Sequence, residues 1–428
     1  MFRNSSSSST SQSTAIAAAV TVSVGITAYY ALRKYIKSKC IPNRSVEPSR
    51  YEHNKRRNAT YPDPIQNSWY GFCFSDELKQ GEIKEMLLLH QNFILWRDEN
   101  GKPVCQDAYC IHLGANFSSG GKVEDGCLKC PFHEWKFDRD GKVVEIPYNA
   151  EPHNCPTTKT LKTYPCVEYC GIIYVYYHAD GLPPQFELPA YADKLMKEEG
   201  YFPYGRWDSG IRTVTVVDWV DQFADYSHFN TLHQKFLIPF TMLPIPDWLF
   251  ELFPIGIEHK LKCYRCDDDD WVQKKDEIGV DLVDKHFICF TDAAGLTWNG
   301  KLMEHTISET VELGMGPTTT LFYIPFKLGT IRAIIFFTPT DGGTVSRAQY
   351  YLDGKSRYNP LARFIAWVIT GIGISQLEAD TVILEKKIRL RKPLLQAADG
   401  PWNRVNNWLK HFYSESSSKC YKSIKNDW

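Results

Sequence analysis

The sequence predicts an α+β protein with two globular domains behind an N-terminal transmembrane helix. Residues 14–32 carry no charge and are apolar along their whole length. Residues 66–178 consist of short aromatic and apolar runs of strand length, separated by turn residues. Beyond these, longer strand-like runs combine with a long helical stretch at 360–390. This order favours an all-β domain followed by an antiparallel sheet gripped by helices.

Length and composition limit the classes of function. The chain has 428 residues, of which 43% are apolar, so it has room for two or three domains with substantial cores. The formal net charge of −1 gives no indication of nucleic-acid binding. Thirteen Cys are scattered along the chain without the density of a small disulfide-rich domain, which favours a reducing compartment.

The N-terminal region is expected to anchor the protein in a membrane. Residues 1–13 are rich in Ser and Thr and are expected to be disordered. Residues 14–32 are about as long as the shortest membrane-spanning helices, and basic residues follow at once, which places the body on the cytosolic side. A cleaved secretory signal and a mitochondrial transit peptide are the alternatives. Residues 33–65 are expected to form a polar, Pro-containing linker.

Two pairs of Cys and His predict an iron–sulfur cluster. The first pair is Cys110-x-His112 and the second is Cys130-x-x-His133. Two Cys and two His in such mixed pairs are the ligands of a Rieske [2Fe–2S] centre. A zinc site uses the same residue types but commonly groups its Cys and its His separately. A set of unrelated core Cys and His is the other alternative.

The expected strands place both pairs inside one all-β domain that spans residues 66–178. Trp69–Phe74, Lys84–Leu89 and Phe93–Arg97 are runs of strand length before the first pair, and Gly171–Tyr177 is a buried-strand run after the second. Residues 179–428 form the second domain. Its expected strands are Gly279–Phe290, Thr306–Leu313, Thr318–Leu328, Ile331–Thr338 and Gly343–Tyr351.

A second metal site is expected near Asp225, His228 and His233, within a segment of the second domain expected to be helical over 218–235. Asp-x-x-His places Asp225 and His228 on one helical face, whereas His233 overshoots a regular turn. Both imidazoles reach one ion if the helix is distorted or ends there. Two His and one carboxylate on one face of Fe(II) leave positions open for O2 and substrate. An amphipathic helix with exposed His is the alternative.

With both motifs in place, residues 66–390 resemble the Rieske non-haem iron oxygenases. The resemblance implies that His228 and His233 bind mononuclear Fe(II). It also implies that Asp380, in the segment Gln376–Ile383, supplies the distant carboxylate; a solvated helix acid is the alternative. O2 is then the co-substrate.

The same resemblance assigns roles to three residues beside the iron ligands. Asp225 is implied to bridge the cluster His of a neighbouring subunit to the iron His. Asp221 and Gln222 fall where the family often has an acidic residue and an Asn near the iron, and Gln222 departs from that pattern. A head-to-tail homotrimer is also implied.

Four segments resemble the animal sterol 7-desaturases of the Neverland type: Pro62–Tyr70, Asp107–Ala115, Asp225–His233 and Asp399–Pro401. The resemblance implies cholesterol as substrate and loss of hydrogen at C7 and C8 to give 7-dehydrocholesterol, a step in steroid hormone biosynthesis. The expected membrane is the endoplasmic reticulum. The alternative is a Rieske monooxygenase that hydroxylates another sterol or apolar ring compound.

The chain needs an external source of electrons. It lacks a GxGxxG nucleotide fingerprint and the Cys spacing of plant ferredoxins, so NAD(P)H electrons are expected through a separate reductase or ferredoxin. A pure electron carrier would need no second metal. The apolar, Pro-broken stretch Phe236–Ile257 is expected either to line a lipid-facing entrance to the iron or to form a core loop.

Overall fold

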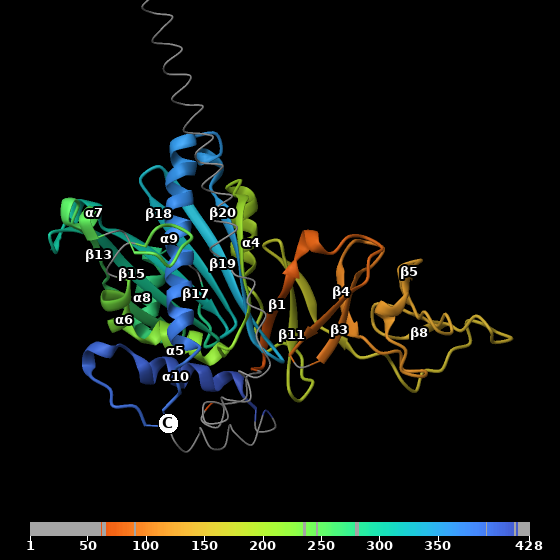
Figure 1. Ribbon diagram of the computed structural model, residues 1–428. Coiled ribbons are helices and arrows are strands. Elements are labelled where there is room, and N and C mark those ends of the chain that lie inside the picture. The colour runs from red at the N-terminus through yellow and green to blue at the C-terminus, as the bar shows by residue number, and fades with distance from the viewer. Residues whose placement is uncertain are drawn as a thin grey trace, which may run out of the picture.

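Two domains lie side by side in the computed structural model (Figure 1). It describes residues 61, 66–89, 91–233, 237–244, 247–278, 282–390, 392–414 and 417. The N-terminal domain consists of small antiparallel sheets. The larger C-terminal domain is one wide antiparallel sheet with helices against it.

The N-terminal domain contains three antiparallel sheets. The first joins β1 (Ser68–Phe74), β11 (Ile172–Tyr177) and β10 (Cys166–Tyr169). The second joins β2 (Lys84–Leu88), β3 (Gln91–Arg97), β4 (Pro103–Asp107) and β9 (Thr163–Tyr164). The third joins β5 (Lys122–Glu124), β6 (Cys127–Lys129), β7 (Lys136–Phe137) and β8 (Val143–Glu145). The four strands expected here are confirmed to within two residues.

The two Cys/His loops rest on an apolar core of their own. Trp96, Phe117, Leu128 and Phe137 are fully buried and cluster with both Cys of the motif. Phe117 and Phe137 meet edge to face, with ring centroids 5.6 Å apart. Burial of four such side chains contributes several kcal/mol, which holds the two loops in fixed positions.

The C-terminal sheet has nine strands. The order along the sheet is β12 (Phe202–Arg212), β20 (Gly343–Leu352), β19 (Gly329–Thr340), β18 (Thr319–Phe326), β17 (Ser308–Met315), β15 (Phe287–Trp298) and β13 (Ile255–Glu258). Two further strands pair with β15, namely β14 (Leu261–Arg265) and β16 (Lys301–Leu302). The strand expected at Gly279–Phe290 begins only at Phe287 and runs on to Trp298, so that prediction was wrong at both ends.

Helices cover one face of this sheet (Figure 1). The long helix α9 (Pro360–Leu384) lies across it, and α5 (Val216–Ala224), α6 (Tyr226–Leu232) and α10 (Trp402–Leu409) lie near one end of α9. The remaining α-helices among the described residues are α4 (Ala190–Glu198), α7 (Asp247–Leu252) and α8 (Asp269–Ile278). The expected arrangement of helices gripping an antiparallel sheet is confirmed.

The helix α9 is long, apolar and only partly buried. Asn359 caps its start, and Pro360 occupies the first turn, where a missing N–H is tolerated. Among the described residues it is the one helix long and apolar enough to cross a membrane, although a third of its most apolar window is buried. The N-terminal transmembrane helix expected at residues 14–32 lies outside the described residues, as does most of the linker at 33–65.

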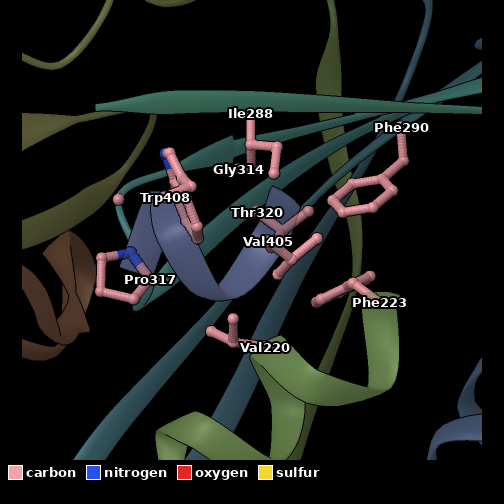
Figure 2. Close-up of a pocket in the computed structure, with 10 residues that line it drawn as sticks. Val220, Phe223, Ile288, Phe290, Gly314, Pro317, Thr320, Val405 and Trp408 are labelled. Atoms are coloured by element: carbon pink, nitrogen blue, oxygen red, sulfur yellow. The ribbon is translucent and has the colours of Figure 1, made fainter. Parts of the chain in front are cut away.

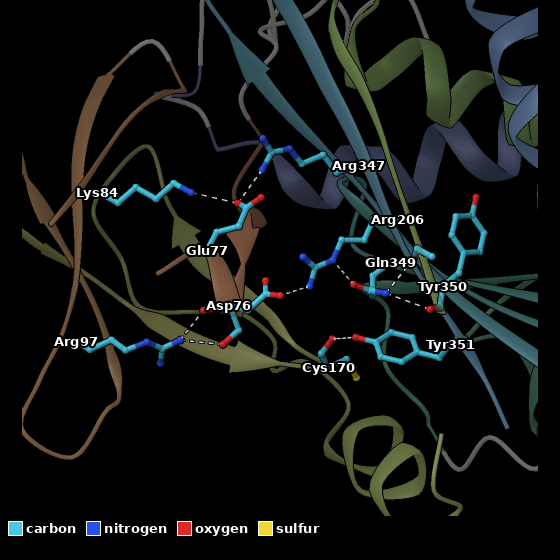
Figure 3. Close-up of polar contacts among 12 residues, drawn as sticks. Asp76, Glu77, Lys84, Arg97, Cys170, Arg206, Arg347, Gln349, Tyr350 and Tyr351 are labelled. Atoms are coloured by element: carbon cyan, nitrogen blue, oxygen red, sulfur yellow. Dashed lines mark hydrogen bonds and ion pairs between the residues drawn. The ribbon is translucent and has the colours of Figure 1, made fainter. Parts of the chain in front are cut away.

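The domain interface combines surface ion pairs with one very close backbone approach. Arg206 pairs with Asp76 at 2.9 Å, and Arg347 lies 3.4 Å from Glu77 (Figure 3). Such exposed pairs contribute little, on the order of 0–1 kcal/mol. At Gly71, in contrast, a Cβ atom would lie 2.4 Å from the ring of Phe336 on β19. The interface therefore requires glycine in β1 so that the two sheets can meet.

Candidate metal centres

The two Cys/His loops have the same backbone conformation. In the first loop the N–H of Cys110 donates to the carbonyl of Ala115 at 2.9 Å. In the second loop the N–H of Cys130 donates to the carbonyl of Trp135, also at 2.9 Å. Each loop therefore closes five residues after its Cys, and the two turns form a matched pair.

A left-handed residue occupies the same place in both turns. Gly114 has φ +75° and Glu134 has φ +60°, and each donates its N–H to the carbonyl of the Cys four residues earlier. Glycine adopts this conformation readily, whereas for Glu134 it is strained by about 1–2 kcal/mol. The strain persists because the loop requires that backbone shape to direct its Cys and His.

The four side chains of the motif converge. Cys110 and Cys130 are almost fully buried, and the thiol of Cys130 lies near enough to that of Cys110 to help raise its pKa. The rings of His112 and His133 lie 4.8 Å apart, centroid to centroid. Burial raises the pKa of the Cys110 thiol to about 12. A bound iron would hold such a thiol as thiolate, so the donor set fits a cluster.

Aromatic and apolar side chains surround the two cluster His. His112 stacks on Trp135 at a centroid distance of 4.5 Å and an angle of 6°. Phe132 packs against His133 at 3.9 Å. Phe132 and Leu113 are themselves exposed, so the outer edge of this site is an apolar rim around two partly exposed imidazoles.

A second group of possible ligands lies in the C-terminal domain. His228 belongs to α6, His233 follows directly on the end of that helix, and Asp380 belongs to α9. One ligand atom from each residue lies within 4.8 Å of the other two. The helix expected over 218–235 is in fact two helices. The helical conformation is interrupted at Asp225, and α6 ends at Leu232, just before His233. The break explains how a His pair five residues apart reaches one point.

Asp225 orients His228 through its backbone. Its side chain caps α6 by accepting the N–H of His228 at 3.3 Å. Its carbonyl oxygen lies 2.5 Å from Nδ1 of the same residue. If Nδ1 carries the proton, Nε2 keeps a lone pair that can bind a metal. A hydrogen bond from the other ring nitrogen to a backbone carbonyl is common in metal-binding His. Asp225 lies just outside α6, as its N-cap, whereas His228 lies within it. The prediction that both side chains share one face of a continuous helix was therefore wrong.

Three buried polar atoms at this point have no hydrogen-bond partner among the described residues: Nε2 of His228, Nδ1 of His233 and Oδ1 of Asp380. Nε2 of His233 lies 3.0 Å from that same oxygen without hydrogen-bond geometry. Each unsatisfied buried group destabilises a fold by about 1–3 kcal/mol. Burial also lowers the pKa of His228, which keeps it neutral. A divalent cation would satisfy all three residues, so the site fits a metal ion.

Asp221 and Gln222 are placed differently from Asp225. Asp221 is fully buried and pairs with Arg389 at 2.9 Å, which joins α5 to the chain that follows α9. Burial raises the pKa of Asp221 and the charge of Arg389 opposes that rise. The side chain of Gln222 is half-buried. These contacts give Asp221 a structural role, and catalytic roles for both residues stay predictions.

A buried pair of His259 and Asp292 lies near this centre, and no sequence motif predicted it. Nδ1 of His259 lies 2.6 Å from Oδ2 of Asp292, and both side chains are more than nine-tenths buried. The ring of His259 is 5.4 Å from that of Phe229, which is itself 5.6 Å from that of His233. Only the fold brings these two residues together, because His259 lies in the loop between β13 and β14 and Asp292 lies on β15.

Family models match both domains. Residues 68–165 match the Rieske [2Fe-2S] domain, and residues 175–413 match the 3-ketosteroid 9alpha-hydroxylase C-terminal domain. A cholesterol 7-desaturase of Caenorhabditis elegans is 30% identical over 86% of this chain and 81% of its own length. The chain belongs to the Rieske oxygenase family that includes the cholesterol 7-desaturases.

Further relatives and structures agree with this assignment. The cholesterol 7-desaturase of Drosophila melanogaster is 27% identical over 85% of this Rieske oxygenase and 79% of its own length. The crystal structure of dicamba monooxygenase bound to dicamba matches the fold with a TM-score of 0.54 at 16% identity, covering 81% of this chain and 97% of that one. The N-terminal domain therefore carries a [2Fe–2S] cluster, and the chain is an oxidoreductase.

Proposed function

We propose that this Rieske oxygenase is a cholesterol 7-desaturase. The observation that carries the proposal is a complete His228–His233–Asp380 ligand group in a chain that also contains a Rieske domain and whose relatives bear that name. The overall reaction would remove one hydrogen from each of C7 and C8 of cholesterol. O2, two electrons from the donor and two protons would complete the balance, with two water molecules released.

The bound metals and the protein would contribute different parts of the reaction. When bound, mononuclear iron supplies O2 activation at a site with open positions. The chain itself holds the imidazole of His228 in a fixed orientation through the carbonyl of Asp225. It also excludes water, because the helix-covered face of the sheet is largely apolar. A small cavity of about 20 Å³ between α5, α10 and that face is lined by Phe223, Phe290 and Trp408, among others (Figure 2).

Electrons would come from a separate NAD(P)H-dependent reductase or ferredoxin. The β5 strand, in the same domain as the cluster loops, and the α6 helix of the metal site lie on opposite sides of the molecule (Figure 1). Electron transfer within one subunit would therefore be slow. A head-to-tail homotrimer, in which the cluster of one subunit faces Asp225 of the next, would shorten the path. Direct contact between Asp225 and a partner's cluster His is part of this proposal.

The protein would act at the membrane in which its substrate dissolves. Besides the anchor proposed for residues 14–32, an exposed apolar surface lies beside α9. The hairpin 237–244 packs Phe240 on Trp367 at 5.1 Å, and Leu243 beside its Leu237–Pro244 bridge is exposed, as is Phe364 on the helix. Exposed apolar patches of this kind are typical of membrane contact. The endoplasmic reticulum, with the catalytic body in the cytosol, is the proposed location.

The test is to supply labelled cholesterol to cells that express the full chain and to identify the sterols formed. The expected product is 7-dehydrocholesterol, with none formed by the His228→Ala variant. A hydroxylated sterol without a new double bond would favour the alternative monooxygenase. An unchanged sterol pool, despite an intact cluster spectrum and an active reductase, would reject the proposal.

A further inference from the structure

The pair of His259 and Asp292 has one unexplained polar atom. Nδ1 of His259 faces the carboxylate of Asp292, and Asp292 also accepts the backbone N–H of Lys260 at 3.1 Å. The other ring nitrogen, Nε2, is buried and has no hydrogen-bond partner among the described residues. A buried nitrogen of this kind destabilises the fold by about 1–3 kcal/mol unless a ligand satisfies it.

Glu312 lies beside the same pair. It is directly opposite Phe290 in the β15–β17 ladder, so the two side chains share a face of the sheet, and Asp292 follows two residues after Phe290 on that face. Glu312 is buried, and no hydrogen bond or ion pair joins it to another described residue. Burial and the nearby charge of Asp292 raise its pKa to about 8, so that it carries a proton at neutral pH.

This polar group stands in apolar surroundings under the helices. Phe290 packs against Phe223 of α5 with ring centroids 5.7 Å apart, which shows that this face is the helix-covered one. Phe290 also lines the cavity of Figure 2. On the next strand Phe322 lies opposite Glu312 on the same face. A substrate on this face would therefore meet mainly apolar side chains, together with the hydroxyls of Thr310 and Thr320 and the polar group formed by His259, Asp292 and Glu312.

We propose that His259 and Glu312, with Asp292 as the positioning residue, form the binding site for the hydroxyl group of an otherwise apolar ring substrate. The inference rests on the proposed function, in which that group is the 3-hydroxyl of cholesterol. Nδ1–H of His259 donates to Asp292, so Nε2 accepts the proton of the substrate hydroxyl. The protonated Glu312 donates to the oxygen of the same hydroxyl. One alcohol thus satisfies both residues.

The position of this site relative to the metal ligands suits such a substrate. The ring of Phe229 contacts both the ring of His259 and the ring of His233, with centroid distances of 5.4 Å and 5.6 Å. In a fused-ring sterol, the hydroxyl sits on the first ring and the reacting carbons on the second, so the two ends lie about one ring apart. Anchoring the hydroxyl would fix which carbons face the metal, which is how a distant contact controls orientation in catalysis.

The test compares cholesterol with its analogue cholest-5-ene, which lacks the hydroxyl. Equilibrium binding of each labelled sterol to the purified enzyme with both metal centres loaded gives the discrimination. We expect the native enzyme to bind cholesterol roughly 10- to 100-fold more tightly, since the analogue leaves buried polar groups unsatisfied. His259→Leu and Glu312→Leu should each weaken cholesterol binding and leave cholest-5-ene binding unchanged. Glu312→Gln, which still donates a hydrogen bond, should keep most of the discrimination.

The matched control is Glu309→Leu on the same strand, because Glu309 is partly exposed and pairs with Lys274 instead. It should bind both sterols as the native enzyme does. Cluster absorbance and iron content show that each variant is folded. Equal binding of the two sterols by the native enzyme, or full discrimination in either Leu variant, would overturn the hydroxyl site. A native enzyme that discriminates but makes no 7-dehydrocholesterol would instead reject the proposed function and leave the site standing.

Discussion

At the scale of single residues, one backbone carbonyl selects the metal-binding nitrogen of His228. The carbonyl of Asp225 engages Nδ1, and Nε2 turns toward His233 and Asp380. The selection needs no second carboxylate, unlike many metal-binding His.

Replacing His228 should separate the two metal centres. His228→Ala removes one of three ligands of the mononuclear site and leaves the distant cluster loops untouched. We expect total iron to fall from about three to about two atoms per chain, with sterol turnover lost. Metal analysis and visible absorption check this. Unchanged turnover would exclude His228 as a ligand, and a lost cluster spectrum would show that the variant misfolds.

Glu312 should make stability depend on pH. The folded state raises its pKa from 4.5 to about 8, so between these values the folded chain holds a proton that the unfolded chain has released. The free energy of unfolding should therefore fall as pH rises through this window, and level off above it. Glu312→Gln should remove that part of the slope. Denaturant unfolding midpoints of the C-terminal domain at several pH values measure it, with Glu309→Gln as the variant that keeps the slope.

The ligands differ in how far the sequence could predict them. The Cys/His pairs are local motifs, and short loops keep their members together, so their convergence follows from spacing. Asp380 comes from a helix far along the chain, and only the family resemblance pointed to it. His259 and Asp292 had no signal at all, because a single His in a loop and a single Asp on a strand far along the chain carry no periodicity or spacing that marks them as a pair.

At the scale of elements, the apolar pattern predicted strands better than helix ends. β17 to β20 begin and end within two residues of expectation, since turn residues mark each boundary. The prediction of one helix over 218–235 was wrong, although the apolar spacing of that segment is irregular. Thr215 and Asp225 each cap a helix there, and the second cap was hidden in a residue expected to be inside one.

Two glycines of α9 should respond oppositely to the same change. A Cβ on Gly371 would lie 2.6 Å from Pro239 and from Phe240, whereas nothing lies within 4 Å of a Cβ on Gly373. Gly371→Ala should push the hairpin 237–244 off the helix and destabilise the domain by about 1–3 kcal/mol. Gly373→Ala should stabilise it by about 0.5–1 kcal/mol through helix propensity. Thermal unfolding of both variants tests the contrast, and equal shifts would contradict the close packing.

At the scale of the whole molecule, the two metal centres lie in different domains. The two Cys/His loops belong to the N-terminal domain, and the metal ligands belong to α6, its C-terminal end and α9. The strand β5 and the helix α6 lie on opposite sides of the molecule (Figure 1). The two domains are joined closely at Gly71, so a large rotation that brought the centres together would break that packing. The sequence could predict both centres but not their separation, which depends on how the domains are joined.

Mixing two inactive variants tests whether electrons cross between subunits. Cys110→Ser chains lack the cluster but keep the mononuclear site, and His228→Ala chains have the reverse defect. In a head-to-tail ring assembled from equal amounts of both, roughly a quarter of the sites would pair an intact cluster with an intact iron of the neighbouring subunit. Sterol turnover should therefore return to about that fraction of the native rate.

The comparison sample contains the same two variants, assembled separately and mixed only at the assay. It should remain inactive, because preassembled rings do not exchange subunits during the measurement. If co-assembled chains are also inactive while size-exclusion chromatography shows mixed trimers, electron transfer must take place within one chain. The gap between the two centres would then have to close by a domain movement large enough to separate Gly71 from Phe336, which crosslinking at that contact would block.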